Sequence, residues 1–329
     1  MSAQRVLFLG GTGVLSAACA REAVAAGLDL TAVTRGRTTS RPLPEGVRAV
    51  EADVRDDASM RAALGDETFD VVVNFIGYTP DDVRADVARY AGRTGQYIFI
   101  STGSVYARPA PALPIVESSA RRNNGFEYPA QKLRCEEALE QAYRYEDFPV
   151  TIVRAAHVYD RTTLPLLAGW TAIERWRAGK AVVVHGDGTS LWNLLHARDF
   201  ARGLIGLVGN RHAVGDSVHI TSDEILTWDE IHLCLAAAAG ATPRIVHRSS
   251  EDIGREIAWM GPVLQEDFRH SVIYDNSRIK RLVPDFSPKV PFAQGAREIV
   301  AWFDQEPSRR RANPELDAAF DRLVGDRHG

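Results

Sequence analysis

The sequence predicts an α/β fold in which helices cover both faces of a doubly wound parallel sheet, with a smaller, mostly helical C-terminal lobe. Three observations predict this class. Short apolar runs alternate with segments of helical composition, a glycine-rich turn directly follows the first of these runs, and the pattern changes after Arg154. Short continuous apolar runs are typical of parallel strands that are buried on both faces.

The first apolar run and the turn after it indicate a dinucleotide site. Residues 5–10 are apolar, Gly11-Thr12-Gly13 interrupts them, and residues 14–26 have helical composition. Glycines at such a turn let backbone N–H groups approach a pyrophosphate at the helix N-terminus, where the helix dipole favours negative charge. Ser16 stands where a third glycine is usual, and an ordinary strand-to-helix turn is the alternative interpretation. The residues expected to contact the cofactor here are Gly10, Thr12, Gly13, Val14 and Leu15.

The residues after the second predicted strand favour NADP(H). This strand spans residues 28–34 and is followed by Arg35 and Arg37, without an acidic residue. A carboxylate there would accept hydrogen bonds from the ribose hydroxyls, whereas an arginine can pair with a 2′-phosphate. NAD is the alternative cofactor, because both arginines could be solvated loop residues.

Later strands complete the predicted cofactor site. Residues 71–75 and 97–100 have the composition of buried parallel strands. Asp53 follows another strand-like run and is placed to contact the adenine amino group. The cofactor contacts expected from these segments are Asp53, Val54, Phe75, Ile76 and Gly77. We therefore expect a Rossmann-type dinucleotide-binding domain at residues 1–160, with returning segments near 191–222, and a substrate-binding lobe at 161–190 and 223–329.

Tyr128 and Lys132 form a candidate proton-transfer pair. They lie four residues apart, so their side chains share one face of a helix. A phenol with an ordinary pKa of about 10 is a poor base at neutral pH, but a neighbouring cation stabilises the phenolate. The same spacing also occurs on solvated helices, so the order of the other motifs decides its meaning.

That order resembles the extended short-chain dehydrogenases/reductases, the superfamily that includes sugar-nucleotide epimerases and dehydratases. The matching stretches are residues 9–13, 101–106, 128–132, 154–159, 186–188 and 196–200. The resemblance implies a triad of Thr102, Tyr128 and Lys132, with Ser104 as the competing candidate for the hydroxyl member. Tyr128 would exchange a proton with a substrate oxygen while hydride moves to or from the nicotinamide on the same carbon. Thr102 would hydrogen-bond that oxygen, and Lys132 would hold the nicotinamide ribose and lower the pKa of Tyr128.

Departures from the family pattern leave the substrate open. Sugar-nucleotide dehydratases of this superfamily place Asp-Glu after the catalytic threonine, and here that dipeptide is Gly103-Ser104, which argues against such a dehydratase. Trp192 occupies the place of an arginine that clamps a diphosphate. A second arginine is also replaced, in the stretch 264–267, although Arg269 or Lys280 could substitute for it.

His157 stands where the family usually has asparagine, and it would line the substrate pocket. Both His157 and Trp192 could instead be structural. The leading hypothesis is NAD(P)-dependent oxidation, reduction or epimerisation at a secondary alcohol or ketone carbon of a sugar-like, nucleotide-linked substrate. A stand-alone NADPH ketoreductase acting on a non-nucleotide carbonyl compound is the alternative enzyme, favoured by Trp192 and Leu264.

A cofactor-sensing or RNA-binding protein on the same scaffold is the non-enzymatic alternative. The run Arg309-Arg310-Arg311 raises it, but the formal net charge is −4 and acidic residues follow this run. A solvated helix flank is therefore the preferred interpretation, and a nucleic-acid partner is not expected.

Composition agrees with a two-lobed enzyme without adding chemistry. The 329 residues are 45% apolar, which suffices for a large core. Cys19, Cys135 and Cys234 are widely spaced and match no metal or redox motif, which indicates a reducing compartment and no metal. No apolar stretch approaches the about 20 residues needed to cross a bilayer. We expect a cytoplasmic protein, and the resemblance implies a homodimer.

The C-terminal part shows a sparser pattern. Helices are expected at 164–176, 197–208, 275–282 and 292–303, with a returning strand at 217–221 and an exposed tail at the end. Thr227 and Glu230 form the pattern of a capping box that opens a helix through residue 239. Trp170, Trp176 and Trp259 are expected in the core.

Overall fold

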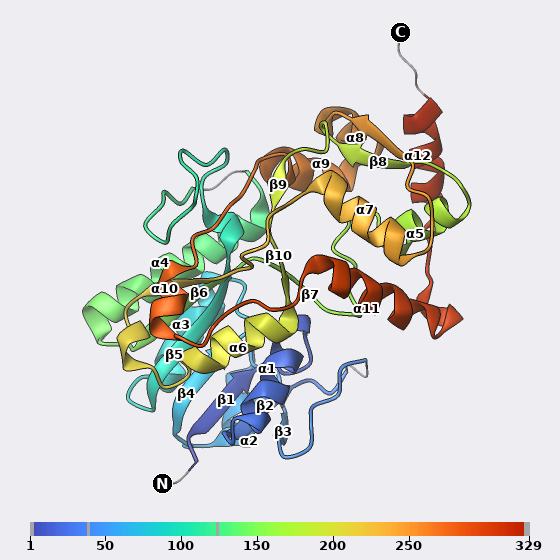
Figure 1. Cartoon of the computed structure of the whole chain (residues 1–329). Helices are drawn as coiled ribbons and strands as arrows, with labels where there is room; N and C mark the ends of the chain where they lie inside the picture. Colours follow the sequence, from blue (N-terminus) through green and yellow to red (C-terminus); the bar gives the residue numbers. More distant parts are fainter. Residues whose placement is uncertain (1–2, 38–39, 123–124, 326–329) are drawn as a thin grey trace.

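Seven parallel strands form the central sheet of the computed structural model, which describes residues 3–37, 40–122 and 125–325 (Figure 1). The strand order is β11-β6-β5-β4-β1-β2-β3. The strands are β1 (Arg5–Leu9), β2 (Asp29–Thr34), β3 (Arg48–Glu51), β4 (Phe69–Asn74), β5 (Thr94–Thr102), β6 (Val150–Ala155) and β11 (Ser217–Ile220). The order reverses between β1 and β4, and α/β folds bind ligands at such a reversal, beyond the carboxyl ends of the strands. The predicted doubly wound fold is confirmed.

Two hydrophobic layers cover the sheet. On β1, Val6 and Phe8 pack towards one face, and Leu7 and Leu9 pack towards the other. The first face is covered by α1 (Val14–Ala25), α6 (Ala197–Leu207) and α10 (Ser277–Leu282). The second is covered by α2 (Asp57–Leu64), α3 (Pro80–Tyr90) and α4 (Glu127–Glu146). Burial on both faces explains why the strands read as continuous apolar runs.

The C-terminal lobe lies beyond one end of the sheet and has a core of its own (Figure 1). Its helices are α5 (Trp170–Arg177), α7 (Trp228–Ala238), α8 (Ser250–Glu256), α9 (Gly261–Val263), α11 (Phe292–Asp304) and α12 (Pro314–Gly325). Three strand pairs join it to the sheet domain and brace it: β7 (His157–Tyr159) with β10 (Leu194–His196), β8 (Val182–His185) with β13 (Ile245–Arg248), and β9 (Leu191–Trp192) with β12 (Leu226–Thr227). Short helical turns are η1 (Gly103–Val105), η2 (Arg211–Ala213), η3 (Ala258–Met260), η4 (Leu264–Phe268) and η5 (Pro307–Arg309).

Several C-terminal predictions are confirmed and three are wrong. The capping box at Thr227 and Glu230 is present at the start of α7. Helix α5 begins at Trp170, six residues after the predicted start at Leu164. The expected exposed tail is instead helix α12, which buries Leu316, Ala319, Phe320 and Leu323. Trp259, expected in the core, is 58% exposed.

The Arg309-Arg310-Arg311 run is engaged by its surroundings. Arg309 lies 4.0 Å from the centre of the Trp302 ring and pairs with Glu306, while Arg310 pairs with Asp304. Within the described ranges, none of the helices is both long and apolar enough to span a membrane. The homodimer and the cytoplasmic location stay predictions.

Candidate active site

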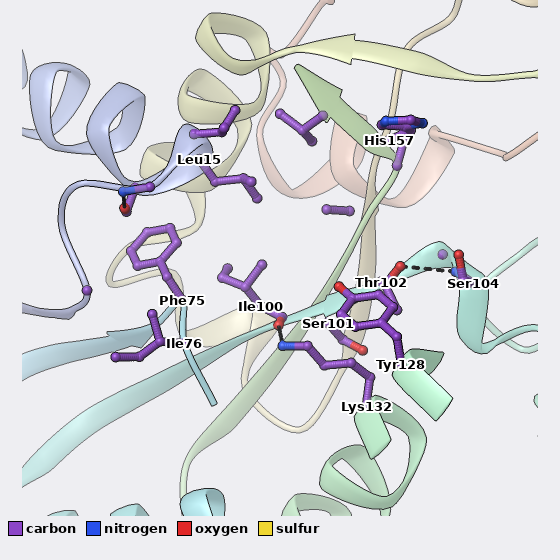
Figure 2. Close-up of a pocket in the computed structure, with 18 of the residues that line it drawn as sticks. Leu15, Phe75, Ile76, Ile100, Ser101, Thr102, Ser104, Tyr128, Lys132 and His157 are labelled. Carbon is purple, nitrogen blue, oxygen red and sulfur yellow. Dashed lines mark hydrogen bonds between the residues drawn. The ribbon is translucent and has the colours of Figure 1, made fainter. Parts of the chain in front are cut away.

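A cavity of about 600 Å³ lies at the carboxyl ends of the central strands, where the sheet order reverses (Figure 2). It brings together the turn after β1 with residues of α1, β2, β5, β6, α4 and the C-terminal lobe. The predicted site residues that line it are Gly10, Thr12, Gly13, Val14, Leu15, Arg35, Asp53, Val54, Phe75, Ile76, Thr102, Ser104, Tyr128, Lys132, His157 and Trp192. Gly77 is the exception, because it is buried behind the lining.

The glycine turn after β1 lets a ligand come close to the backbone of the protein. Gly10 has a φ of +88°, and a Cβ there would lie 2.8 Å from the side chain of Ile76. Gly13 is the N-cap of α1 and has no side chain to satisfy the first N–H groups of the helix. Ser16 accepts a hydrogen bond from the Gly13 N–H at 2.9 Å, so it fixes the turn as well as being small. The turn therefore fits a pyrophosphate held by backbone N–H groups.

The opposite wall offers cations where a ribose would lie. Arg35 and Arg37 line the cavity and are exposed, and neither has a hydrogen-bond or ion-pair partner among the described residues. Arg41, by contrast, pairs with Asp160 at 2.9 Å. Asp53 accepts a hydrogen bond from the backbone of Arg55 at 3.1 Å, which leaves part of its carboxylate facing the cavity.

The ammonium group of Lys132 is bound by two backbone carbonyl oxygens. It is 6% exposed, and its Nζ donates hydrogen bonds to the oxygen of Gly77 at 2.7 Å and to that of Ile100 at 2.8 Å (Figure 2). Burial lowers the pKa of Lys132 to about 8. Gly77 thus serves the site through its carbonyl, and Asn74 fixes its turn by accepting from the N–H groups of Ile76 and Gly77 at 2.8 and 2.6 Å.

Tyr128 lies beside Thr102 on the cavity wall (Figure 2). The side chain is 39% exposed, and the partial burial of its phenol in the cavity wall raises its pKa, while a hydrogen bond from Thr102 acts in the opposite direction. Lys132, which we expect to lower this pKa, donates instead to the carbonyl oxygens of Gly77 and Ile100, and its effect on Tyr128 stays a prediction. Tyr128 is therefore a neutral phenol at neutral pH.

Hydrogen bonding separates the two hydroxyl candidates. Thr102 Oγ1 accepts from the backbone N–H of Ser104 at 3.2 Å, so its own proton is free to face Tyr128 (Figure 2). Ser104 Oγ donates to Asp267 at 2.7 Å. The geometry favours Thr102 over Ser104 as the partner of Tyr128.

The other end of the cavity, which we call the distal end, is lined by Ser104, His157, Trp192, Asn193, Val263, Asp267, Phe268, Val272 and Tyr274. Trp192 is buried, and its indole N–H donates to Nδ1 of His157 at 3.2 Å. Burial lowers the pKa of His157 to about 4, so the ring is neutral and carries its proton on Nε2. Trp192 thus orients His157 instead of clamping a phosphate.

The distal end also contains a cluster that the sequence did not reveal. Arg108 donates from Nε to Asp267 at 3.0 Å and from Nη2 to the Tyr274 oxygen at 3.2 Å. A Cβ on Gly103 would lie 2.4 Å from that same oxygen. Arg108 and Tyr274 are 166 residues apart, so no local spacing could have linked them.

No cation faces the distal end among the described residues that line it. The expectation that Arg269 or Lys280 replaces the missing phosphate contacts is wrong, because neither lines the cavity. Arg269 pairs with Glu251 at 2.6 Å, and Lys280 pairs with Asp223 at 2.8 Å. The charged pair Arg108–Asp267 is internally neutralised.

Comparison with known proteins shows the family of the chain. Residues 6–220 match the model of the NAD dependent epimerase/dehydratase family. The chain belongs to this family. It is thus an enzyme of the extended short-chain dehydrogenase/reductase superfamily, whose cofactor is a nicotinamide dinucleotide.

Individual relatives differ in what they do. The chain is 28% identical over 323 residues to a 2′-dehydrokanamycin reductase from Streptomyces kanamyceticus, with 97% of this chain and 89% of the relative covered. It is 25% identical over 290 residues to a chloroplast stem-loop binding protein of 41 kDa from Arabidopsis thaliana, with 82% and 73% covered. Among solved structures, the UDP-glucose 4-epimerase of Thermotoga maritima, crystallised with UDP-glucose, shares the fold with a TM-score of 0.74 at 18% identity, with 91% and 98% covered.

Proposed function

We propose that this protein is an NADP(H)-dependent reductase of a ketone on a sugar-like compound that carries no nucleotide, and that it also oxidises the corresponding secondary alcohol. The observation that carries the proposal is the charge of the cavity wall. Arg35 and Arg37 have no ion-pair partner among the described residues, whereas the described lining of the distal end offers aromatic rings, neutral polar groups and the carboxylate of Asp267, and no cation. A nucleotide-linked substrate brings a diphosphate, and phosphates are bound by arginine, lysine or helix N-termini.

The residues present fit a nicotinamide dinucleotide. The turn at Gly10 to Gly13 would hold the pyrophosphate, Asp53 would contact the adenine, and Lys132 would hold the nicotinamide ribose. Arg35 would pair with the 2′-phosphate, which favours NADP(H) over NAD(H). When bound, the cofactor supplies the hydride for reduction or accepts it in oxidation.

Tyr128 acts as the proton donor in the reduction. Because burial raises its pKa, it holds its proton at neutral pH, which is the form that a ketone reduction requires. As hydride reaches the carbonyl carbon, the phenol gives its proton to the carbonyl oxygen, and the product is a secondary alcohol. Thr102 hydrogen-bonds the same oxygen and stabilises the charge that develops there. Solvent then reprotonates Tyr128.

The first relative supports a reductase. The 2′-dehydrokanamycin reductase aligns with this chain over nearly its whole length, including the distal end. The competing proposal is epimerisation of a nucleotide sugar, which the likeness to the UDP-glucose 4-epimerase structure favours. An epimerase returns the hydride to the same substrate and keeps its cofactor, whereas a reductase exchanges the cofactor in each turnover.

The deciding experiment measures cofactor consumption. Purified protein is mixed with NADPH or NADH and with ketones in matched pairs, for example cyclohexanone and 2-hydroxycyclohexanone, and with an oxidised aminoglycoside. Ketone-dependent loss of NADPH supports the proposal, and Tyr128→Phe is the matched control that keeps the ring but lacks the proton. Conversion of UDP-glucose to UDP-galactose without net cofactor loss, with NAD retained through purification, would replace the proposal with the epimerase.

A further inference from the structure

The ring of Tyr274 fills the space beside the residue that follows Thr102. A Cβ on Gly103 would lie 2.4 Å from the Tyr274 oxygen and 2.7 Å from its ring carbon Cζ. Any side chain at position 103 would therefore collide with the phenol. Where the resembled dehydratases carry an acidic side chain after the threonine, this protein places a phenolic oxygen that comes from the C-terminal lobe.

The backbone around Tyr274 is fixed on both sides. Ile115 donates its N–H to the oxygen of Ile273 at 2.7 Å, and Asp275 donates to the oxygen of Ile115 at 2.9 Å. These two bonds form an isolated parallel bridge between Ile115 and Tyr274. The ring also lies against His219, with 5.3 Å between centres. The phenol is thus held in place without a ligand.

The hydrogen bond from Arg108 decides which way the phenol can act. A guanidinium only donates, so the Tyr274 oxygen is the acceptor of the 3.2 Å bond from Arg108 Nη2. Arg108 cannot turn away, because its Nε is held by Asp267 at 3.0 Å. The O–H of Tyr274 is left as a donor, and no acceptor for it occurs among the described residues, although the side chain lines the cavity. Burial raises the pKa of Tyr274, so this proton is retained at neutral pH.

We propose that Tyr274 donates a hydrogen bond to a substrate hydroxyl on the carbon next to the ketone, so that the enzyme selects α-hydroxy ketones. This inference rests on the proposed function. Thr102 and Tyr128 would hold the reacting oxygen, and the Tyr274 phenol lies against Gly103, the residue after Thr102, on the wall of the same cavity. Tyr274 is then a specificity residue that takes no part in the proton transfer.

The test compares two ketones that differ by one hydroxyl. For wild type we expect 2-hydroxycyclohexanone to have a kcat/KM about 3–10-fold above that of cyclohexanone, the worth of one neutral hydrogen bond. Tyr274→Phe keeps the ring against Gly103 and removes the hydroxyl, so it should abolish this preference mainly through KM. The change also removes the acceptor of the bond from Arg108 Nη2, which keeps its hydrogen bond to the Gly103 oxygen at 3.2 Å. Equal losses for both ketones, or an unchanged preference, would overturn the assignment. Thermal unfolding of Tyr274→Phe checks that the fold is kept.

A binding measurement separates this inference from the proposed function. Cyclohexane-1,2-diol and cyclohexanol are titrated into the protein saturated with NADPH, with which an alcohol cannot react, and tryptophan fluorescence reports binding. We expect the diol to bind more tightly to wild type and the two to bind equally to Tyr274→Phe. If wild type reduces neither ketone but discriminates the diol through Tyr274, the reductase fails and the hydroxyl site stands. If the diol has no advantage, the hydroxyl site fails even where ketones are reduced.

Discussion

Replacing Lys132 by methionine tests the most unfavourably buried charge of the site. Lys132 is 6% exposed, and its only hydrogen-bond partners in the described structure are the carbonyl oxygens of Gly77 and Ile100. Burial lowers its pKa from 10.5 to about 8. The folded protein therefore holds this cation at neutral pH in an environment that disfavours it, which reduces the stability of the folded state.

The magnitude follows from the pKa difference. A pKa of about 8 in place of 10.5 corresponds to a destabilisation of about 3 kcal/mol at pH 7. Between pH 8 and pH 10.5 the unfolded chain binds more protons than the folded protein, so the free energy of unfolding rises with pH. The destabilisation caused by the buried charge vanishes near pH 10.5. Methionine loses two hydrogen bonds that contribute about 1 kcal/mol each. We therefore expect Lys132→Met to be about 1 kcal/mol more stable than wild type at pH 7 and about 2 kcal/mol less stable at high pH.

Urea unfolding without cofactor, repeated from pH 7 into the alkaline range, measures this change of sign. Exposed Lys289→Met is the control for titration of the rest of the chain, because its side chain has no partner among the described residues. The same variant of Lys132 should lose activity, since the ribose contact is removed. A stability difference between Lys132→Met and wild type that stays constant with pH would refute the account of Lys132 as a buried, unfavourable cation.

The remaining predictions concern chemistry and selectivity. Tyr128→Phe should lower turnover about 10²-fold or more and leave NADPH affinity nearly unchanged in a fluorescence titration, because only the transferable proton is lost. Unchanged turnover would remove Tyr128 from the mechanism. Arg35→Ala should weaken NADPH binding about 10-fold and NADH binding little, because only NADPH carries the 2′-phosphate; equal losses would contradict an NADP(H) site. Trp192→Phe should raise the substrate KM several-fold with kcat nearly unchanged, because it releases His157 from one tautomer. Since the pKa of His157 is about 4, the KM of wild type should show no histidine titration between about pH 5 and 8, and a titration in that range would show that His157 ionises.

The sequence was sufficient for the features that local periodicity and spacing encode. The alternation of apolar runs and helices gave the parallel sheet, and the four-residue spacing of Tyr128 and Lys132 placed both side chains on the cavity side of α4. The glycine turn was predicted because its requirement is a backbone property: Gly10 adopts a φ of +88° and has no room for a Cβ. Each of these features depends on residues within a few positions of one another.

Features that depend on distant contacts were missed or misjudged. The direction of the Lys132 ammonium depends on carbonyls 55 and 32 residues away, so the sequence could not show that they, and not the phenol, would bind it. Arg269 and Lys280 looked available for phosphate binding because their partners, Glu251 and Asp223, are remote in sequence. The mixed composition after Arg311 concealed the apolar face of α12, because this face is buried only when it packs against the C-terminal lobe.

The two ends of the cavity divide the work of recognition by charge. At the glycine turn and the second strand, backbone N–H groups and the arginines Arg35 and Arg37, which have no partner among the described residues, suit a ligand with several negative charges. At the distal end, the Trp192 N–H is used by His157, and the Asp267 carboxylate accepts from Arg108 and Ser104, so the donors left towards the cavity include the neutral O–H of Tyr274 and Nε2–H of His157. Neutral donors discriminate by position instead of by charge, and a missing hydroxyl leaves one of them unpaired. Under the proposed function, the cofactor motifs would supply the redox chemistry, and the tryptophan, histidine and tyrosine of the distal end would recognise the pattern of hydroxyl groups on the substrate.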